Sequence, residues 1–167
     1  MHLIPINEVE PEELLQYFKE LVALDDQRVE RPEDVAKISL VDEQRWIDSL
    51  IQRTVKQEGV SFCIKSSEGV IGVGEVERRP RWIERHVGEI RFGIFPLHKL
   101  EGKFLVDALV SGAKEIGITI LYYFHLQSQV QGIEIMLESG FSPAGRIKNY
   151  YKVGGGYVDR IFLERSL

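Results

Sequence analysis

The stretch HVGEIRFGIFPLHKLEGKFLVDALVSGAKEI, residues 86 to 116, decides how this sequence folds. Its first ten residues form an extended, largely apolar run that predicts a strand, and apolar residues recur on one helical face from Phe104 to Ile116. Between them, PLHKLEGKF (96–104) predicts a tight turn with one glycine. A strand, a turn and a helix N-terminus can bind phosphate through free backbone N–H groups and the helix dipole. The turn is therefore either a phosphate site or a simple connecting loop.

Outward from this stretch, the pattern predicts helices and strands in a definite order. Upstream we expect a helix from Pro11, a second helix that Ser39 and Asp42 begin as a capping box, and strands at 60–67 and 69–79. Downstream we expect a buried strand at 118–126, a short helix capped by Ser128 with Gln131, and two strands around the glycine turn at 154–156. Residues 25–38 and 78–86 are expected to be loops.

Composition and charge limit the class of protein. The 167 residues are 44% hydrophobic and 28% charged, which predicts one globular domain over residues 1–167. The net charge of −5 argues against general nucleic-acid binding. Without an apolar leader or membrane-length run, we expect no membrane partner and a cytoplasmic location. Cys63 is the only cysteine, so a buried, inert thiol is expected and no cysteine metal cluster.

Four segments, in order, resemble the GNAT superfamily of acyl-coenzyme A-dependent N-acyltransferases. VGEIRFGIFP (87–96) resembles the family's fourth strand and LVDALVSGAKEIGI (105–118) its third helix. GIEIMLESGF (132–141) resembles the end of its fourth helix, and YYKVGGGYVDRIFLERSL (150–167) resembles its terminal hairpin. The order and the spacing carry the resemblance, since no single segment is specific.

The resemblance implies an α/β (α+β) fold. Its mixed, mostly antiparallel sheet is split between the fourth and fifth strands and flanked by about four helices. It also implies acetyl-CoA as the acyl donor, with the pantetheine arm in the split, an amine acceptor whose identity stays open, no metal, and a homodimer as one option. The implied activity is N-acetyl transfer to a primary amine of a small molecule or protein N-terminus, by direct attack on the thioester. The alternative is a noncatalytic GNAT-like domain used for binding or assembly.

The family's diphosphate turn usually reads Q/R-x-x-G-x-G/A, and this chain departs from it in both registers. One register places Gly102 on the last glycine; the other, which we prefer, places Lys99 on the arginine and Gly102 on the first glycine. A shortened, glycine-poor loop weakens coenzyme binding because large side chains disfavour positive φ. The resemblance implies these coenzyme-binding residues: Ile94, Phe95, Lys99, Leu100, Glu101, Gly102, Lys103, Phe104 and Gln129.

The resemblance also suggests catalytic residues. Glu89 is the candidate base, directly or through water; alternatively it turns outward and pairs with Arg91 or a neighbouring strand. Met136 stands where the family often has a tyrosine that protonates the departing thiolate, so Tyr123 and His125, with Tyr122 beside them, are the candidate acids. The Arg-rich loop at 78–86 is either part of an acceptor site for an acidic substrate or a charged hairpin tip.

Overall fold

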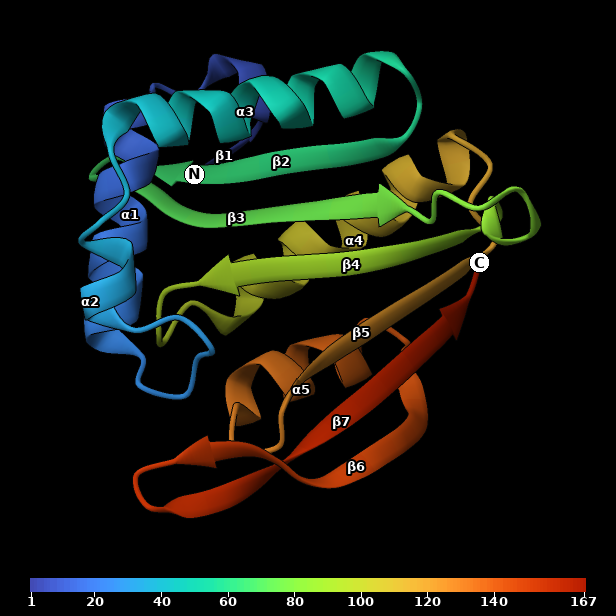
Figure 1. Ribbon diagram of the computed structural model, residues 1–167. Helices are drawn as coiled ribbons and strands as arrows, with labels where there is room; N and C mark the ends of the chain where they lie inside the picture. The colour runs from blue at the N-terminus through green and yellow to red at the C-terminus, as the bar shows by residue number, and fades with distance from the viewer.

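The computed structural model describes all 167 residues and is built on one seven-stranded sheet in the order β1-β2-β3-β4-β5-β7-β6 (Figure 1). Neighbouring strands are antiparallel except β4 and β5, which are parallel. The mixed, mostly antiparallel sheet predicted from the sequence is confirmed. The strands are β1 (His2–Pro5), β2 (Gly59–Ser66), β3 (Gly69–Arg78), β4 (Val87–Ile94), β5 (Ile120–Leu126), β6 (Ser142–Val153) and β7 (Gly156–Ser166).

Helices cover both faces of the sheet. The helices are α1 (Pro11–Leu24), α2 (Pro32–Val35), α3 (Leu40–Val55), α4 (Lys99–Glu115) and α5 (Val130–Glu138). In Figure 1, α1 to α3 lie together beside β1 to β3, while α4 crosses behind β2, β3 and β4 and packs against α5. No helix is both long and apolar enough to cross a membrane.

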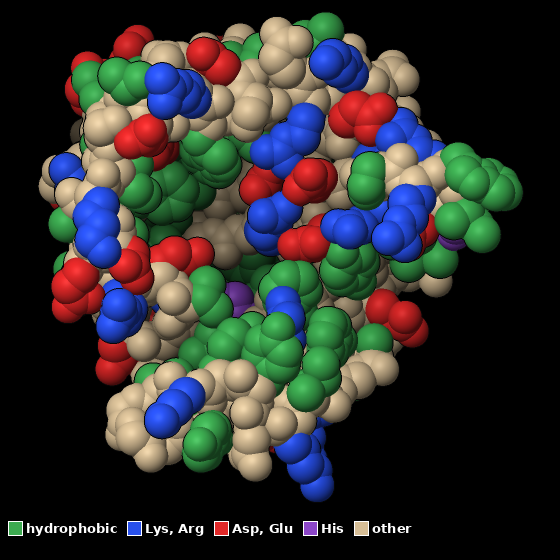
Figure 2. All heavy atoms as spheres, viewed as in Figure 1, with side chains coloured by type: hydrophobic (Ala, Val, Ile, Leu, Met, Phe, Trp, Pro, Cys, Tyr) green, Lys and Arg blue, Asp and Glu red, His purple; other side chains and the backbone are tan.

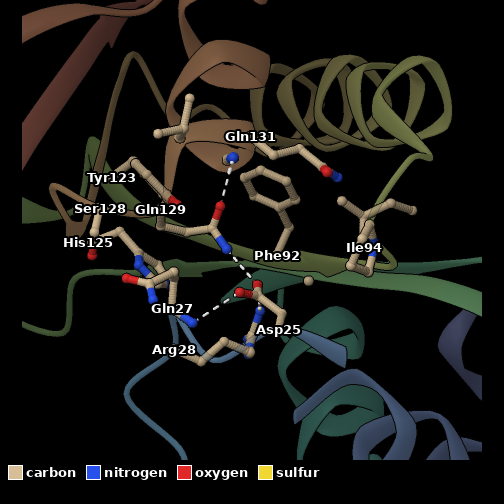
Figure 3. Close-up of a pocket in the computed structure, with 14 residues that line it drawn as sticks. Asp25, Gln27, Arg28, Phe92, Ile94, Tyr123, His125, Ser128, Gln129 and Gln131 are labelled. Atoms are coloured by element: carbon tan, nitrogen blue, oxygen red, sulfur yellow. Dashed lines mark hydrogen bonds and ion pairs between the residues drawn. The ribbon is translucent and has the colours of Figure 1, made fainter. Parts of the chain in front are cut away.

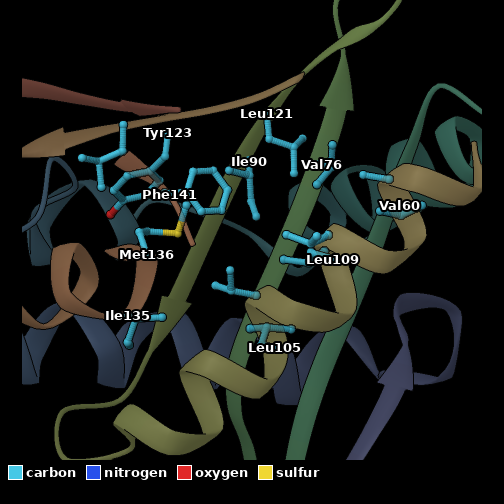
Figure 4. Close-up of a cluster of buried hydrophobic side chains, with 14 of the residues drawn as sticks. Val60, Val76, Ile90, Leu105, Leu109, Leu121, Tyr123, Ile135, Met136 and Phe141 are labelled. Carbon is cyan, nitrogen blue, oxygen red and sulfur yellow. The ribbon is translucent and has the colours of Figure 1, made fainter. Parts of the chain in front are cut away.

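Two apolar clusters hold these layers together. The larger one joins α4 and α5 to the sheet and includes Leu105 and Leu109 of α4 with Ile90 of β4 (Figure 4). The smaller one lies between α1, α3 and the sheet and contains Leu14, Tyr17, Leu21, Ile47 and Cys63, among others. The predicted burial of Cys63 is confirmed, and this burial raises the pKa of its thiol well above the usual range.

The sheet splits between β4 and β5, as the GNAT resemblance implies. β4 and β5 pair only over Val87–Glu89 and Ile120–Tyr122, and the two strands then diverge (Figure 1). Beyond this point β4 keeps β3 as its neighbour, while β5 pairs with β7. The second half of β4 therefore has one edge without a strand partner.

Three local predictions need correction, one strand was not predicted, and one prediction is confirmed. Strand β1 was not predicted, and α2 lies inside a predicted loop, because four residues are too few to show a period. Helix α4 starts at Lys99, inside the predicted turn. Helix α5 is capped by Gln129 rather than Ser128. The predicted capping box of Ser39 and Asp42 is confirmed.

Candidate functional site

A cavity of about 170 Å³ lies where β4 and β5 separate (Figure 3). Residues 92–94 of β4 form one wall, and Tyr123 and His125 of β5 form another. The N-terminal end of α5 and the loop after α1 complete the lining. Of the residues implied by the GNAT resemblance, Ile94, Gln129, Tyr123 and His125 meet in this cavity.

Gln129 joins two sides of the cavity (Figure 3). Its Oε1 accepts a hydrogen bond from the Gly132 amide at 3.0 Å, and its Nε2 donates to the Asp25 carboxylate. The amide reaches both partners at once, which explains why Gln129 caps the helix while the Ser128 hydroxyl is buried without a partner. Sequence spacing shows the local cap pattern but not the contact with Asp25, which is 104 positions away.

Gln131 occupies the end of the open β4 edge. Its Nε2 donates to the Phe95 carbonyl at 3.2 Å, and its Oε1 accepts from the Leu97 amide at 3.3 Å. The side-chain amide thus pairs with the backbone as a neighbouring strand would. This role was missed from the sequence, where Gln131 looked only like a capping partner.

Burial shifts the pKa of both candidate acids on β5, His125 and Tyr123. Burial, and secondarily the positive charge of Arg28, lowers the pKa of His125 to about 4, so the ring is neutral near pH 7. Its Nδ1 accepts from the Leu126 amide at 2.9 Å, which assigns the ring proton to Nε2. Burial raises the pKa of Tyr123 well above its ordinary value, so its hydroxyl stays protonated. Both side chains are available as hydrogen-bond donors.

Glu89 does not line the cavity. It lies at the last position of β4 that pairs with β5. Glu89 is 8% exposed, and its carboxylate accepts a hydrogen bond from the Tyr122 hydroxyl at 2.8 Å. Arg91 lies at 3.1 Å and Arg79 at 3.4 Å. The pairing with Arg91 that the sequence left open as an alternative is present.

The turn before α4 differs from both registers considered from the sequence. Lys99, Leu100, Glu101 and Gly102 belong to the first turn of the helix. The residue with positive φ is Leu97, at 72°, and it is 97% exposed. Gly102 is a packing glycine instead, because a Cβ there would lie 2.7 Å from Cδ1 of Ile135.

The cations of this helix start are paired with carboxylates. Lys99 lies 2.8 Å from both Glu134 and Glu138 of α5, and Lys103 pairs with Asp107 one turn along. No side chain caps the helix. The backbone N–H groups of its first turn are therefore the groups best placed to meet an anion.

The remaining coenzyme candidates have different environments. Leu100 is 80% exposed and Phe104 is 47% exposed, both on α4. Phe95, directly after β4, packs against Tyr17 of α1, with ring centroids 5.1 Å apart. This contact supports the end of β4 from the sheet face that carries α1. No group of three His, Cys, Asp or Glu residues is arranged to hold a metal ion.

The arginines of the loop after β3 have structural partners. Arg78 donates to the carbonyls of Arg85 and Ile116, and Arg85 binds Glu58 at 2.6 Å. Arg79 is the partner of Glu89. These contacts favour the structural alternative for the loop over a site for an acidic acceptor.

Comparison with known proteins agrees with the geometry. The family model described as an acetyltransferase (GNAT) domain matches residues 12–162, while no curated protein matches significantly. Among solved structures, the ribosomal-protein-alanine N-acetyltransferase of Brucella melitensis has a TM-score of 0.81 at 18% identity, covering 100% of both chains. A GNAT-family acetyltransferase of Streptococcus pneumoniae reaches 0.85 at 13% identity, covering 99% of both. The phosphinothricin acetyltransferase of Sinorhizobium meliloti, in complex with acetyl-CoA, reaches 0.81 at 19% identity, covering 99% of this chain and 88% of its own. With nine-tenths of its length matched by the family model, this chain belongs to the GNAT acetyltransferase family.

Proposed function

We propose that this protein is an acetyl-CoA-dependent N-acetyltransferase acting on a primary amine of a small molecule or of a protein N-terminus. The observation that carries the proposal is the open edge of β4. Beyond Glu89 this edge has no strand neighbour, and it borders the cavity between β4 and β5. The acetyl-CoA complex of the Sinorhizobium meliloti relative supports acetyl-CoA as the donor.

The residues at the split fit an acyl-coenzyme A. A pantetheine arm carries two amide groups, and amides can pair with a free strand edge as an added strand does. Ile94 lies at this edge and Gln129 across the cavity from it, while Phe95 follows the end of β4 and its carbonyl already accepts a hydrogen bond from Gln131. The free backbone N–H groups of Lys99, Leu100 and Glu101, in the uncapped first turn of α4, would receive the diphosphate. Lys99 and Lys103 would contribute little charge, since each already has a carboxylate partner.

The reaction needs one bond formed and one broken. The ammonium group first gives one proton to Glu89 through water, since Glu89 does not itself line the cavity. The neutral amine nitrogen then attacks the thioester carbonyl carbon, the C–N bond forms as the C–S bond breaks, and the second nitrogen proton goes to the departing thiolate, which leaves as the thiol. We assign hydrogen-bond donation, rather than proton transfer, to Tyr123 and His125. His125 is neutral, and a phenol with a raised pKa gives up its proton to a thiolate of pKa about 8.5 only at a cost.

Isothermal calorimetry with acetyl-CoA tests the proposal. Saturable binding is expected, with acetyl phosphate as the control because it has the acetyl group but no pantetheine arm. Acetyl transfer to a panel of primary amines then tests catalysis. Absence of both heat and a thermal shift at millimolar acetyl-CoA would refute the proposal.

A noncatalytic binding domain is the second candidate. It is favoured by the paired state of Lys99 and Lys103 and by Met136, which is fully buried in the apolar core (Figure 4). A thioether cannot donate a proton, so no acid stands at that place. Acetyl transfer to any amine, lost in a Glu89→Gln variant that still binds acetyl-CoA, would exclude this candidate.

A further inference from the structure

A second, larger cavity of about 440 Å³ lies on the sheet face that carries α1 to α3. Figure 2 shows a deep hollow on this face, between the helical wall and a group of Arg and Glu side chains on the strands. The volume falls within the range of small-molecule sites, about 300–1,000 Å³. Its apolar wall is formed by Phe18, Val22, Val35, Ile38 and Trp46.

The two cavities are neighbours. Arg28, Phe92 and Gly93 line both of them. Gly93 lies on β4, four residues beyond Glu89, the last β4 residue that pairs with β5, and so belongs to the open half of the split. A molecule in the larger cavity therefore lies against the wall of the cavity where the acyl donor is proposed to lie.

Glu43 is the unusual group in the larger cavity. It is 3% exposed, it lines the cavity from the first turn of α3, and its Oε1 has no hydrogen-bond partner. Glu43 forms no ion pair in the structure. Burial alone raises the pKa of its carboxyl group to about 7. An unpaired, buried carboxylate costs free energy that a bound cation can recover.

The other charges of this cavity are paired. Four carboxylates line it, and Glu30, Asp42 and Glu75 each have an arginine partner, whereas Glu43 has none. Its two cations are already paired: Arg28 with Asp25 and Glu30, and Arg91 with carboxylates of β3 and β4. A ligand carboxylate would meet an acidic lining, whereas an ammonium group would find an unpaired oxygen.

We propose that the larger cavity is the acceptor site and that it takes a primary amine on an apolar, aromatic-sized body, whose ammonium group binds the Glu43 carboxylate. The apolar wall with Trp46 and Phe18 would receive the body. As a step of acetyl transfer the inference rests on the proposed function, but binding of the amine is measurable without acetyl-CoA.

Tryptophan fluorescence can report binding at the larger cavity. The chain has two tryptophans, and Trp82 is 87% exposed on the loop after β3. A Trp82→Phe variant leaves Trp46 as the only reporter, at the cavity wall. We expect 2-phenylethylamine to change its emission saturably, and 2-phenylethanol and 3-phenylpropanoate, which match the body but lack the cation, to bind at least about tenfold more weakly.

A Glu43→Gln change in the same background keeps the shape of the side chain and removes the charge. We expect it to weaken the amine about tenfold or more and to leave the alcohol unchanged, with Glu12→Gln, an exposed glutamate of α1, as the control. Equal binding of amine and alcohol to the unmodified cavity overturns the inference, and that comparison does not depend on whether the Gln variant folds. Amine binding without any acetyl-CoA binding would leave this site standing and refute only the proposed function.

Discussion

The hydroxyl of Tyr122 donates a hydrogen bond to the Glu89 carboxylate at 2.8 Å, and these two residues are also the last pair that joins β4 to β5. The bond fixes the point from which the strands separate. It also gives the carboxylate a neutral donor beside the guanidinium groups of Arg79 and Arg91. These side-chain contacts stabilise the apex of the split, the last paired position of β4 and β5.

Removing this donor should loosen the apex. Tyr122→Phe removes the shorter hydrogen bond to Glu89 Oε2 and leaves only Arg79 at 3.4 Å. Because hydrogen bonds to charged groups are the stronger ones, we expect a loss of about 1.5–3 kcal/mol in the free energy of unfolding, measured by urea denaturation. Tyr157→Phe is the control, since Tyr157 is 62% exposed. Equal losses in the two variants would show that the bond to Glu89 contributes nothing.

A catalytic role for Glu89 is separable from its structural one. If it accepts the amine proton, Glu89→Gln should lower kcat about 10²-fold or more while KM for acetyl-CoA changes little. Glu77→Gln is a matched control, because Glu77 faces Glu89 across the β3–β4 pair and shares its partner Arg91. Similar losses of kcat in both variants would assign Glu89 to the ion-pair network alone.

Gly102 is predicted to matter for helix packing rather than for loop conformation. Gly102→Ala places a Cβ 2.7 Å from Cδ1 of Ile135, so we expect a net loss of about 1 kcal/mol despite the better helix propensity of alanine. Adding Ile135→Val removes that Cδ1 and should recover most of the loss. A double-mutant cycle by thermal denaturation measures the coupling, and additive effects would contradict it.

Leu97 stores backbone strain at the start of α4. Its φ of 72° is disfavoured for a leucine, and at 97% exposure its side chain has little packing to lose. Leu97→Asn should therefore raise the free energy of unfolding by about 0.5–1 kcal/mol, because asparagine tolerates this conformation. Leu100→Asn, a control inside the helix with 80% exposure, should lower it slightly. A loss in the Leu97 variant would show that the residue is not strained.

The sequence predicts the fold better than the site, for physical reasons. Long periodic segments depend on local pattern: the one around Leu105 and Leu109 was predicted as a helix, with its C-terminal end nearly correct. β1 and α2 span four residues each and are set by their neighbours, so no local pattern reveals them. The start of α4 was misplaced because Lys99 and Glu101 suit a helix turn as well as a polar loop.

The site depends on contacts between distant residues. Gln129 and Asp25 are 104 positions apart, and Gln131 reaches the end of β4 from α5. The burial of Glu43 is equally hidden, because on the helix pattern it follows the capping Asp42 like an ordinary first-turn acid. Only the assembled fold shows that this carboxyl group faces a cavity.

The buried Glu43 carboxyl should make stability depend on pH in a definite direction. Burial raises its pKa from 4.5 to about 7 in the folded protein, so the folded state holds a proton that the unfolded state has released. This contribution is fully present below about pH 4.5 and is lost as pH rises through about 7. The shift corresponds to roughly 3 kcal/mol as an upper limit.

Glu43→Gln removes this titration while keeping the side-chain shape. We expect the difference in free energy of unfolding, variant minus wild type, to grow more favourable to the variant between pH 5 and pH 8, in urea titrations at each pH. Glu12→Gln, which is exposed, should follow the wild type at every pH. A constant difference across this range would mean that Glu43 is ionised in the folded protein at pH 5, and that its charge is stabilised by a group other than the bound amine proposed above.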